Sequence, residues 1–216
     1  MTGATASRVN RWVDAAWAER FLSERDEIPH RADGFAALLE VLPERVGRVL
    51  DLGTGDGFAL SMVLGERPGA SGVGVDFQPA MLARAAERFD RDDRVELIEH
   101  DLDLRLPDSL GIFDLVVSSF AIHHCSPDRQ RSLYAEVYDL LEPGGMFVNL
   151  EHVASPTRAL HEEFLGAIGK TPEHDDPSNQ LVEVVPLLGW LVEAGFTDAD
   201  CLWKWRELAL LTARRP

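Results

Sequence analysis

Short aliphatic runs alternate with helix-like segments through most of the chain. The runs are "RVLDL", "GVGVD", "RVELIEH", "FDLVVSSF" and "GGMFVNLEH". All but the third are followed by a segment with helical features, and these expected helices span residues 58–65, 78–89, 127–141 and 156–168. Continuous apolar runs of this length are typical of strands that crossover helices bury on both faces. The pattern predicts an α/β fold with a doubly wound, mainly parallel sheet.

The two ends of the chain add further elements. Apolar residues at helical spacing predict one helix over residues 9–21 and a second over 35–42, which Pro43 ends. The stretch 181–195 is expected to be helical, with a kink at Pro186, and the last two apolar runs are expected to form an antiparallel hairpin. We expect residues 1–45 to cover a pocket that residues 46–216 form.

The segment "TPEHDDPSNQ", residues 171–180, is too polar and too rich in proline to lie in a core. It is either a lid over the pocket, spanning about residues 170–181, or a mobile connector.

Charge limits the partners of the chain. With 37 acidic and 21 basic residues its net charge is −16, which repels phosphate backbones and argues against nucleic acid. A small molecule or a basic substrate fits better, although acidity can also serve solubility alone. The sequence shows no membrane span and no apolar leader, so we expect a cytoplasmic protein that binds no membrane. Its two cysteines are too few for a disulfide framework or a zinc knuckle.

The stretch "VLDLGTGDG", residues 49–57, lies where the first strand passes into a helix. In parallel sheets this turn faces the ligand, and its three glycines allow the backbone to approach a ligand closely. The spacing is G-x-G-x-G, and Phe58 stands where the dinucleotide fingerprint G-x-G-x-x-G requires its third glycine. A pyrophosphate, and with it a nicotinamide cofactor, is therefore disfavoured.

Acidic residues end three successive strands. Asp51 could hold a ligand ammonium or cap the loop amides, and Asp76 follows Gly57 by 19 residues (76 − 57), where a ribose diol would lie. Asp101 could accept a hydrogen bond from an exocyclic amine, beside Leu102, which would cover a ring face. Each acid alone could be a helix cap or a solvated loop residue. Together they predict a ligand of the nucleoside type.

With these motifs, and with "GVDFQPAML", "EHDLDL", "FDLVVSSFAIHH" and "LEPGGMFVN", the chain resembles the class I S-adenosylmethionine-dependent methyltransferases over about residues 46–150. The resemblance implies a Rossmann-like sheet of seven strands in the order 3-2-1-4-5-7-6, with strand 7 antiparallel, and S-adenosyl-L-methionine as the cofactor. It also implies these cofactor-binding residues: Asp51, Gly53, Thr54, Gly55 and Gly57 around the methionine moiety, Asp76 and Phe77 near the ribose and adenine, Asp101 and Leu102 at the adenine, and Ser118 after the fourth strand. Met81 is expected near the adenosine or in the core.

Candidates for the chemistry follow the fourth and fifth strands. A general base for methyl transfer would lie there, which makes His124, His123 and Glu151 the catalytic candidates. A packing or cofactor-site role for the two histidines remains an alternative. A metal site is disfavoured, because adjacent histidines on an extended chain point in opposite directions.

The acceptor side is less well defined. Residues that could bind the substrate are Trp12, Trp17, Arg31, His152 and His174, with Asn179 beside them; for the tryptophans, helix packing is the alternative. Trp203 and Trp205 are expected to pack or to form a homodimer contact. The chain is predicted to methylate an oxygen or nitrogen of a small-molecule acceptor. The alternatives are a relative that binds a modified S-adenosylmethionine and a non-methylating binding protein.

Overall fold

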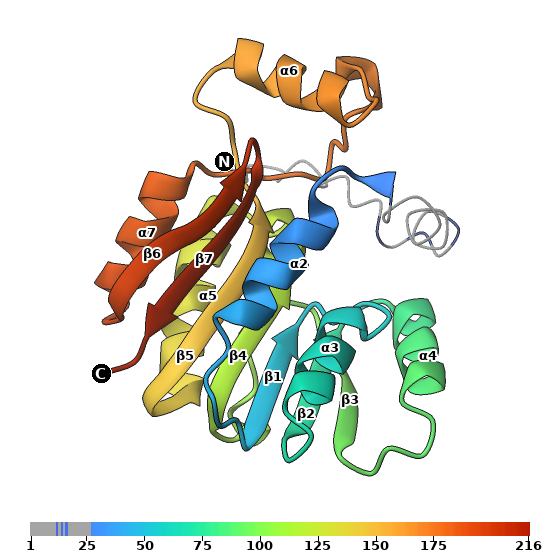
Figure 1. Cartoon of the computed structure of the whole chain (residues 1–216), viewed down its shortest axis with the longest axis vertical. Helices are drawn as coiled ribbons and strands as arrows, with labels where there is room; N and C mark the ends of the chain where they lie inside the picture. Colours follow the sequence, from blue (N-terminus) through green and yellow to red (C-terminus); the bar gives the residue numbers. More distant parts are fainter. Residues whose placement is uncertain (1–11, 13, 15, 17–26) are drawn as a thin grey trace, which may run out of the picture.

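A seven-stranded sheet forms the centre of the structure (Figure 1), a computed structural model that describes residues 12, 14, 16 and 27–216. Within these residues the strand order is β3-β2-β1-β4-β5-β7-β6. Only β7 runs antiparallel to its neighbours β5 and β6. The predicted fold, strand order and antiparallel strand are confirmed. The strands are β1 (Arg48–Leu52), β2 (Ser71–Asp76), β3 (Val95–Glu99), β4 (Phe113–Ser119), β5 (Leu141–His152), β6 (Thr197–Trp205) and β7 (Leu208–Arg214).

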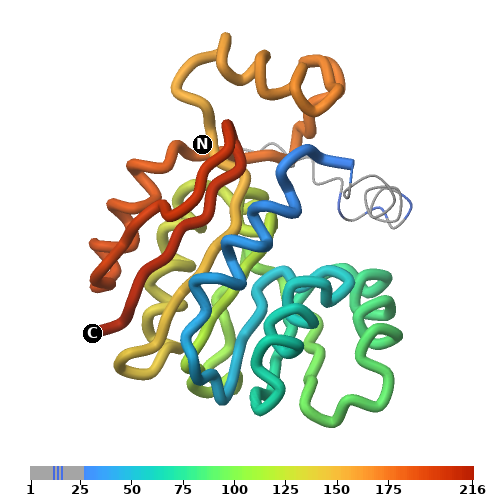
Figure 2. Tube along the Cα trace, in the orientation of Figure 1, coloured from blue at the N-terminus to red at the C-terminus, as the bar shows by residue number. Residues whose placement is uncertain are grey.

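Helices cover both faces of the sheet (Figure 2). The main helices are α2 (Arg31–Glu40), α3 (Phe58–Glu66), α4 (Pro79–Arg88), α5 (Pro127–Leu140), α6 (Arg158–Ala167) and α7 (Val184–Glu193). One apolar core joins α2 and α3 to the sheet, and a second joins α5 and α7 to its other face. Helix α6 stands apart, beyond the end of β5 and next to the β6–β7 turn (Figure 1). Short 3₁₀ helices are η3 (Asp108–Leu110), η4 (Ile122–His124) and η5 (Pro172–His174).

Local sequence explains where several helices begin. Helix α4 has Pro79 at its first position, and the Gln78 side chain accepts a hydrogen bond from a backbone amide of the first turn. Helix α5 repeats this arrangement with Pro127 and the Ser126 hydroxyl. Proline is well tolerated there, because the first N–H groups of a helix have no partner within it. Both helices therefore begin within one residue of the predicted starts.

Two helix predictions need correction or remain open. Helix α7 begins at Val184, so Pro186 lies in its first turn and causes no kink. The helix predicted over residues 9–21 lies largely outside the described residues.

The last hairpin packs within the chain. The Trp203 ring lies against Gly34 of α2, and Trp205 contacts Phe164 of α6. This confirms the packing role expected for the two tryptophans. In the part of the chain that the structure describes, no helix has the length and apolar character needed to cross a bilayer.

Candidate active site

The glycine loop lies at the carboxyl end of β1 with its backbone in a left-handed conformation. Gly53, Gly55 and Gly57 have φ angles of 69°, 56° and 77°. A Cβ atom on Gly53 would lie 2.2 Å from Cβ of Ala121, whereas one on Gly55 would meet no atom within 4 Å. Gly55 lines a cavity, so its missing side chain leaves room for a ligand.

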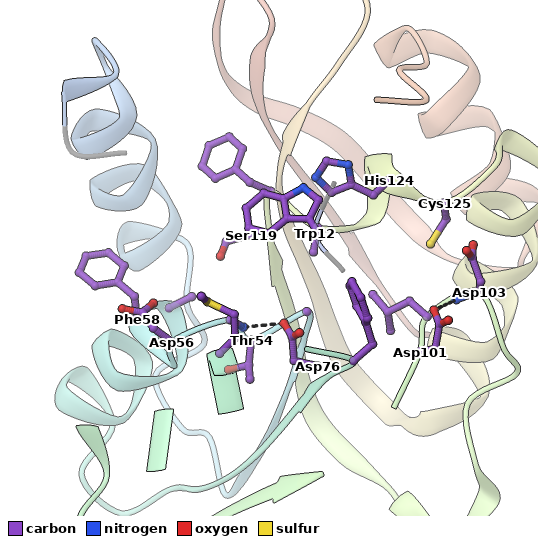
Figure 3. A pocket seen from close by; sticks show the side chains of 18 of the residues that line it. Trp12, Thr54, Asp56, Phe58, Asp76, Asp101, Asp103, Ser119, His124 and Cys125 are labelled. Carbon is purple, nitrogen blue, oxygen red and sulfur yellow. Dashed lines mark hydrogen bonds between the residues drawn. The ribbon is translucent and has the colours of Figure 1, made fainter. Parts of the chain in front are cut away.

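This cavity, hereafter the cofactor cavity, is shown in Figure 3 and lies over the ends of β1, β2 and β4. Eight predicted cofactor residues line it: Gly53, Thr54, Gly55, Asp76, Phe77, Met81, Asp101 and Leu102. Three others lie behind its wall. Gly57 precedes α3, Asp51 is buried below the loop, and the Ser118 hydroxyl donates to the Leu52 carbonyl at 2.8 Å.

Asp76 ties the loop to the second strand. One carboxylate oxygen accepts from the Gly55 amide at 2.8 Å and the other from the Gln78 amide at 2.9 Å. Burial raises the pKa of this carboxyl above its ordinary value. Each carboxylate oxygen can accept a second hydrogen bond, so Asp76 can still bind a ribose diol.

Asp51 is the carboxylate best suited to pair with a ligand cation. Its side chain is fully buried, and Oδ2 accepts from the Thr54 hydroxyl at 2.6 Å. Its Oδ1 has no hydrogen-bond partner, and burial raises the pKa of the carboxyl to about 7. A buried carboxylate oxygen without a partner is unfavourable, and a ligand ammonium would satisfy it. This orphaned oxygen fits the amino group of S-adenosylmethionine.

Sequence reasoning missed several residues of this cavity. Asp56 lines it and forms an ion pair with Arg88 of α4 at 2.5 Å, which ties the loop to that helix. Ser119, the last residue of β4, also lines it, as do Phe120 and Ala121, which follow the strand. Phe120 has a φ of 52°, a strained value for a residue other than glycine and one that is common at functional sites.

A second cavity, the acceptor cavity, adjoins the first. The two share Trp12, Arg31, Phe120 and His124. Its apolar lining consists of Ile28, Phe164, Leu165, Ile168 and Leu208, and its polar lining of His123, His152, Lys170, Asp175, Asp176 and Asn179.

The predicted substrate residues divide into three groups. Trp12, Arg31 and His152 line the acceptor cavity. His174 lines neither cavity; it is exposed and hydrogen-bonded to the Thr171 hydroxyl at 2.8 Å. Trp17 lies outside the described residues.

His123 and Glu151 form a buried pair. Nδ1 of His123 lies 2.5 Å from Oε1 of Glu151, and the His123 backbone amide donates to the other oxygen. Burial raises the pKa of Glu151 to about 7 and lowers that of His123 well below its ordinary value. Only His123 of this pair reaches the acceptor cavity.

His124 lies where the two cavities meet, and its surroundings define its tautomer. The Ser178 hydroxyl donates to Asp176 at 2.7 Å, so its single proton is used there. Nδ1 of His124 lies 3.4 Å from the same hydroxyl oxygen and must carry the proton of that contact. Burial lowers the pKa of His124 well below its ordinary value, so the ring is neutral and Nε2 is the nitrogen without a proton.

His123 and His124 do not lie on an extended backbone, so the expectation that their side chains point in opposite directions is wrong. Residues 122–124 form η4, and the rings of His123 and His124 lie 4.0 Å apart. Among the residues described, no three metal-binding side chains are grouped as an ion would need.

Comparison with known proteins agrees with this geometry. A family model described as a methyltransferase domain matches residues 49–145. The chain is 35% identical over 179 residues to a demethylmenaquinone methyltransferase of Thermus thermophilus. The aligned region covers 82% of this chain and 72% of that protein.

Solved structures show the same fold. An O-methyltransferase family protein from Burkholderia thailandensis superposes with a TM-score of 0.73 at 20% identity, over 95% of this chain and 61% of that one. Human N-acetylserotonin methyltransferase, solved in complex with S-adenosylmethionine, superposes with a TM-score of 0.68 at 18% identity, over 94% of this chain and 57% of that one. The chain thus spans about six tenths of the length of these structural neighbours.

A doubly wound sheet with a glycine loop after β1 and an acid at the end of β2 is typical of nucleoside-binding α/β enzymes. The chain belongs to the class I S-adenosylmethionine-dependent methyltransferases. Its cofactor is S-adenosylmethionine, as predicted.

Proposed function

We propose that this methyltransferase acts on a small-molecule acceptor, at an oxygen or nitrogen atom. The observation that carries the proposal is the acceptor cavity, which opens from the cofactor cavity and has His124 at the junction. An acceptor in this cavity would face the methyl group of the cofactor with a proton acceptor beside it.

The residues divide the work between binding and proton removal. Asp51 would pair with the cofactor ammonium, Asp76 with the ribose, and Gly55 leaves room for the ligand. The cofactor, when bound, supplies an activated methyl group. Nε2 of His124 would take the proton that the acceptor atom loses.

We further propose that the chain covers its own acceptor. Residues 170–181 act as a lid, because Lys170, Asp176 and Asn179 of this segment line the acceptor cavity. The lid is held to the core by the Gln180 amide, which donates to the His123 carbonyl at 2.8 Å. Closing a cover of this kind excludes water from the reaction.

The test is methyl transfer with labelled cofactor to a panel of small phenols, alcohols and amines. Formation of the demethylated cofactor that depends on the added compound, together with a methylated product of matching mass, supports the proposal. Transfer only to protein or RNA, or to none of the acceptors, contradicts it. Mass spectrometry of copurified ligand tests the alternative of a modified cofactor.

The variant His124→Ala tests the base. We expect kcat to fall about 100-fold, within the range of general-base catalysis. The affinity for the demethylated cofactor should change by less than about threefold, because the cofactor is held by groups of β1 and β2. Unchanged turnover would remove His124 from the mechanism.

A further inference from the structure

Glu207 is fully buried although it lies in the two-residue turn, 206–207, between β6 and β7. The preceding Arg206 has a φ of 51°, which is unfavourable for a residue other than glycine. Burying a carboxylate is expensive unless it is paired. The backbone strain and the buried charge together indicate that this side chain has a specific task.

Two histidines bind the Glu207 carboxylate from different elements. Nε2 of His152, at the end of β5, lies 3.0 Å from Oε2, and Nδ1 of His161 on α6 lies 3.0 Å from Oε1. The second nitrogen of His161 lies 3.3 Å from Asp175. Burial alone would raise the pKa of Glu207, but hydrogen bonds from His152, Ser155 and His161 outweigh it and lower the pKa.

This arrangement indicates which ring nitrogens of His161 and His152 donate to carboxylates. Both nitrogens of His161 face carboxylates, so both donate and the ring is cationic; burial lowers its pKa, but Glu207 and Asp175 raise it above the ordinary value. The cationic ring balances the charge of Glu207. His152 meets Glu207 through Nε2, and in the neutral tautomer that this contact selects Nδ1 is the hydrogen-bond acceptor.

His152 and His124 both line the acceptor cavity. Nε2 of His124, which carries no proton, is also an acceptor. The His123 ring lies between them, 4.0 Å from His124 and 5.4 Å from His152. The cavity therefore offers two separated hydrogen-bond acceptors, and Phe164 and Leu208 are part of its apolar wall. A ligand that satisfies both must carry two separated donors on an apolar body.

We propose that His152, positioned by Glu207, is a second recognition point for the acceptor, and that the acceptor is an aromatic compound with two separated hydroxyl groups. One hydroxyl lies at His124 and is methylated, and the other donates to Nδ1 of His152. Glu207 is a positioning residue that fixes the tautomer of His152. The inference rests on the proposed function, because it concerns the acceptor of that reaction.

The experiment measures binding rather than turnover, with the enzyme saturated by the demethylated cofactor. Two matched pairs of probes are compared, one with a short and one with a long separation between the two hydroxyl groups of the diol. The pairs are hydroquinone against phenol, and dihydroxybiphenyl against hydroxybiphenyl. Wild-type enzyme should bind the diol of at least one pair about tenfold more tightly than its partner, the gain from one hydrogen bond to a buried group. Glu207→Gln should reduce this ratio to about one.

Matched variants and a spectroscopic readout complete the test. Glu163→Gln, an exposed acid that faces Arg206 of the same hairpin, should keep the wild-type ratio. His152→Phe leaves the contact between Glu207 and His161 in place and should abolish the preference for the diol, even if Glu207→Gln does not fold. Nitrogen NMR of the imidazole rings should show the proton of His152 on Nε2 in the wild type and a changed tautomer in Glu207→Gln.

Equal affinity for diol and single hydroxyl in both pairs would overturn the proposal, as would a proton on Nδ1 of wild-type His152. A diol preference that survives Glu207→Gln would refute the positioning role. Failure of the proposed function would give a different result: the diol preference would remain, but no probe or panel compound would be methylated. Cofactor affinity is measured separately, to show that the enzyme in each assay is loaded.

Discussion

Asp51→Asn tests whether the cofactor site destabilises the ligand-free fold. Asp51 is fully buried with one unpartnered oxygen, and burial raises its pKa from an ordinary 3.8 to about 7. At pH 8 the native state must hold this carboxylate ionised. A pKa difference of this size corresponds to at most about 4 kcal/mol of lost stability. Asparagine has nearly the same shape and no charge, and its carbonyl can still accept from Thr54.

The pH dependence of this effect has a definite sign. Between pH 4 and pH 7 the native state keeps a proton on Asp51 that the unfolded chain has lost, given the rise in its pKa to about 7. The stability of the ligand-free protein therefore falls as pH rises through this range. Asp51→Asn removes this component. We expect the free energy of unfolding of the variant to exceed that of the wild type by about 2–4 kcal/mol at pH 8. At pH 5 this difference should be smaller by about 2–3 kcal/mol.

Binding should change in the opposite direction. Without the carboxylate the cofactor ammonium loses a charged hydrogen bond of about 1.5–3 kcal/mol, which weakens binding by about ten- to 150-fold. Urea unfolding at pH 5 and pH 8 measures the stability of the two proteins, and titration calorimetry with the demethylated cofactor at pH 8 measures affinity. Asp90→Asn, at an exposed acid, is the control for removing one negative charge. A variant less stable than the wild type at pH 8, or one with unchanged affinity, would show that Asp51 is not a destabilising ligand contact.

Three further substitutions test other contacts. Gly55→Ala should weaken binding of the demethylated cofactor at least tenfold by calorimetry, because its Cβ would enter the cavity, while the positive φ costs the fold only about 1 kcal/mol. Gly34→Val should lower the free energy of unfolding by about 1–3 kcal/mol in urea, because its Cβ would lie 3.0 Å from the Trp203 ring. Asp176→Asn should lower kcat about tenfold with cofactor affinity unchanged, because its amide can redirect the Ser178 hydroxyl proton towards His124. A wild-type value in any of these assays would show that the contact concerned does not have the role given to it.

The sheet was predictable because its strands are buried on both faces and read as continuous apolar runs. The start of α7 was not, since "LVEVVPLLGWLVEAG" is mostly apolar from end to end and Glu183, directly before Val184, makes no side-chain cap. Pro186 fits either a kink or a first turn, and only packing decides between them.

In the cofactor site, the acids could be predicted but the neighbouring serine could not. Asp76 and Asp101 line the cavity because Asp76 ends β2 and Asp101 lies two residues beyond β3, both at the ligand edge of the sheet. Side chains alternate across a strand, so a shift of one residue exchanges the two faces. Ser118 is buried against Leu52, and Ser119 lines the cavity in its place. Sequence gives the end of a strand to within a residue or two, which is too coarse for this choice.

Glu207 shows a different limit. In "WRELAL" it resembles an ordinary turn residue, and nothing next to it in the sequence suggests burial. Its two histidine partners come from positions 152 and 161 and meet it only because β5 and β7 pair and α6 folds back over the hairpin. Contacts between distant segments of this kind cannot be inferred from the local pattern of a single sequence.

The two buried carboxylates, Asp51 and Glu207, differ in a way that separates ligand contact from positioning. Asp51 keeps an oxygen without a partner, so the protein leaves one interaction for a ligand to complete. Glu207 is satisfied by its own histidines, so its effect on a ligand must pass through His152. Replacing Asp51 should therefore relieve the ligand-free fold and weaken binding, whereas replacing Glu207 should disturb both the fold and the choice of acceptor. Opposite changes in stability from two buried acids of one enzyme would be difficult to explain if both were merely structural.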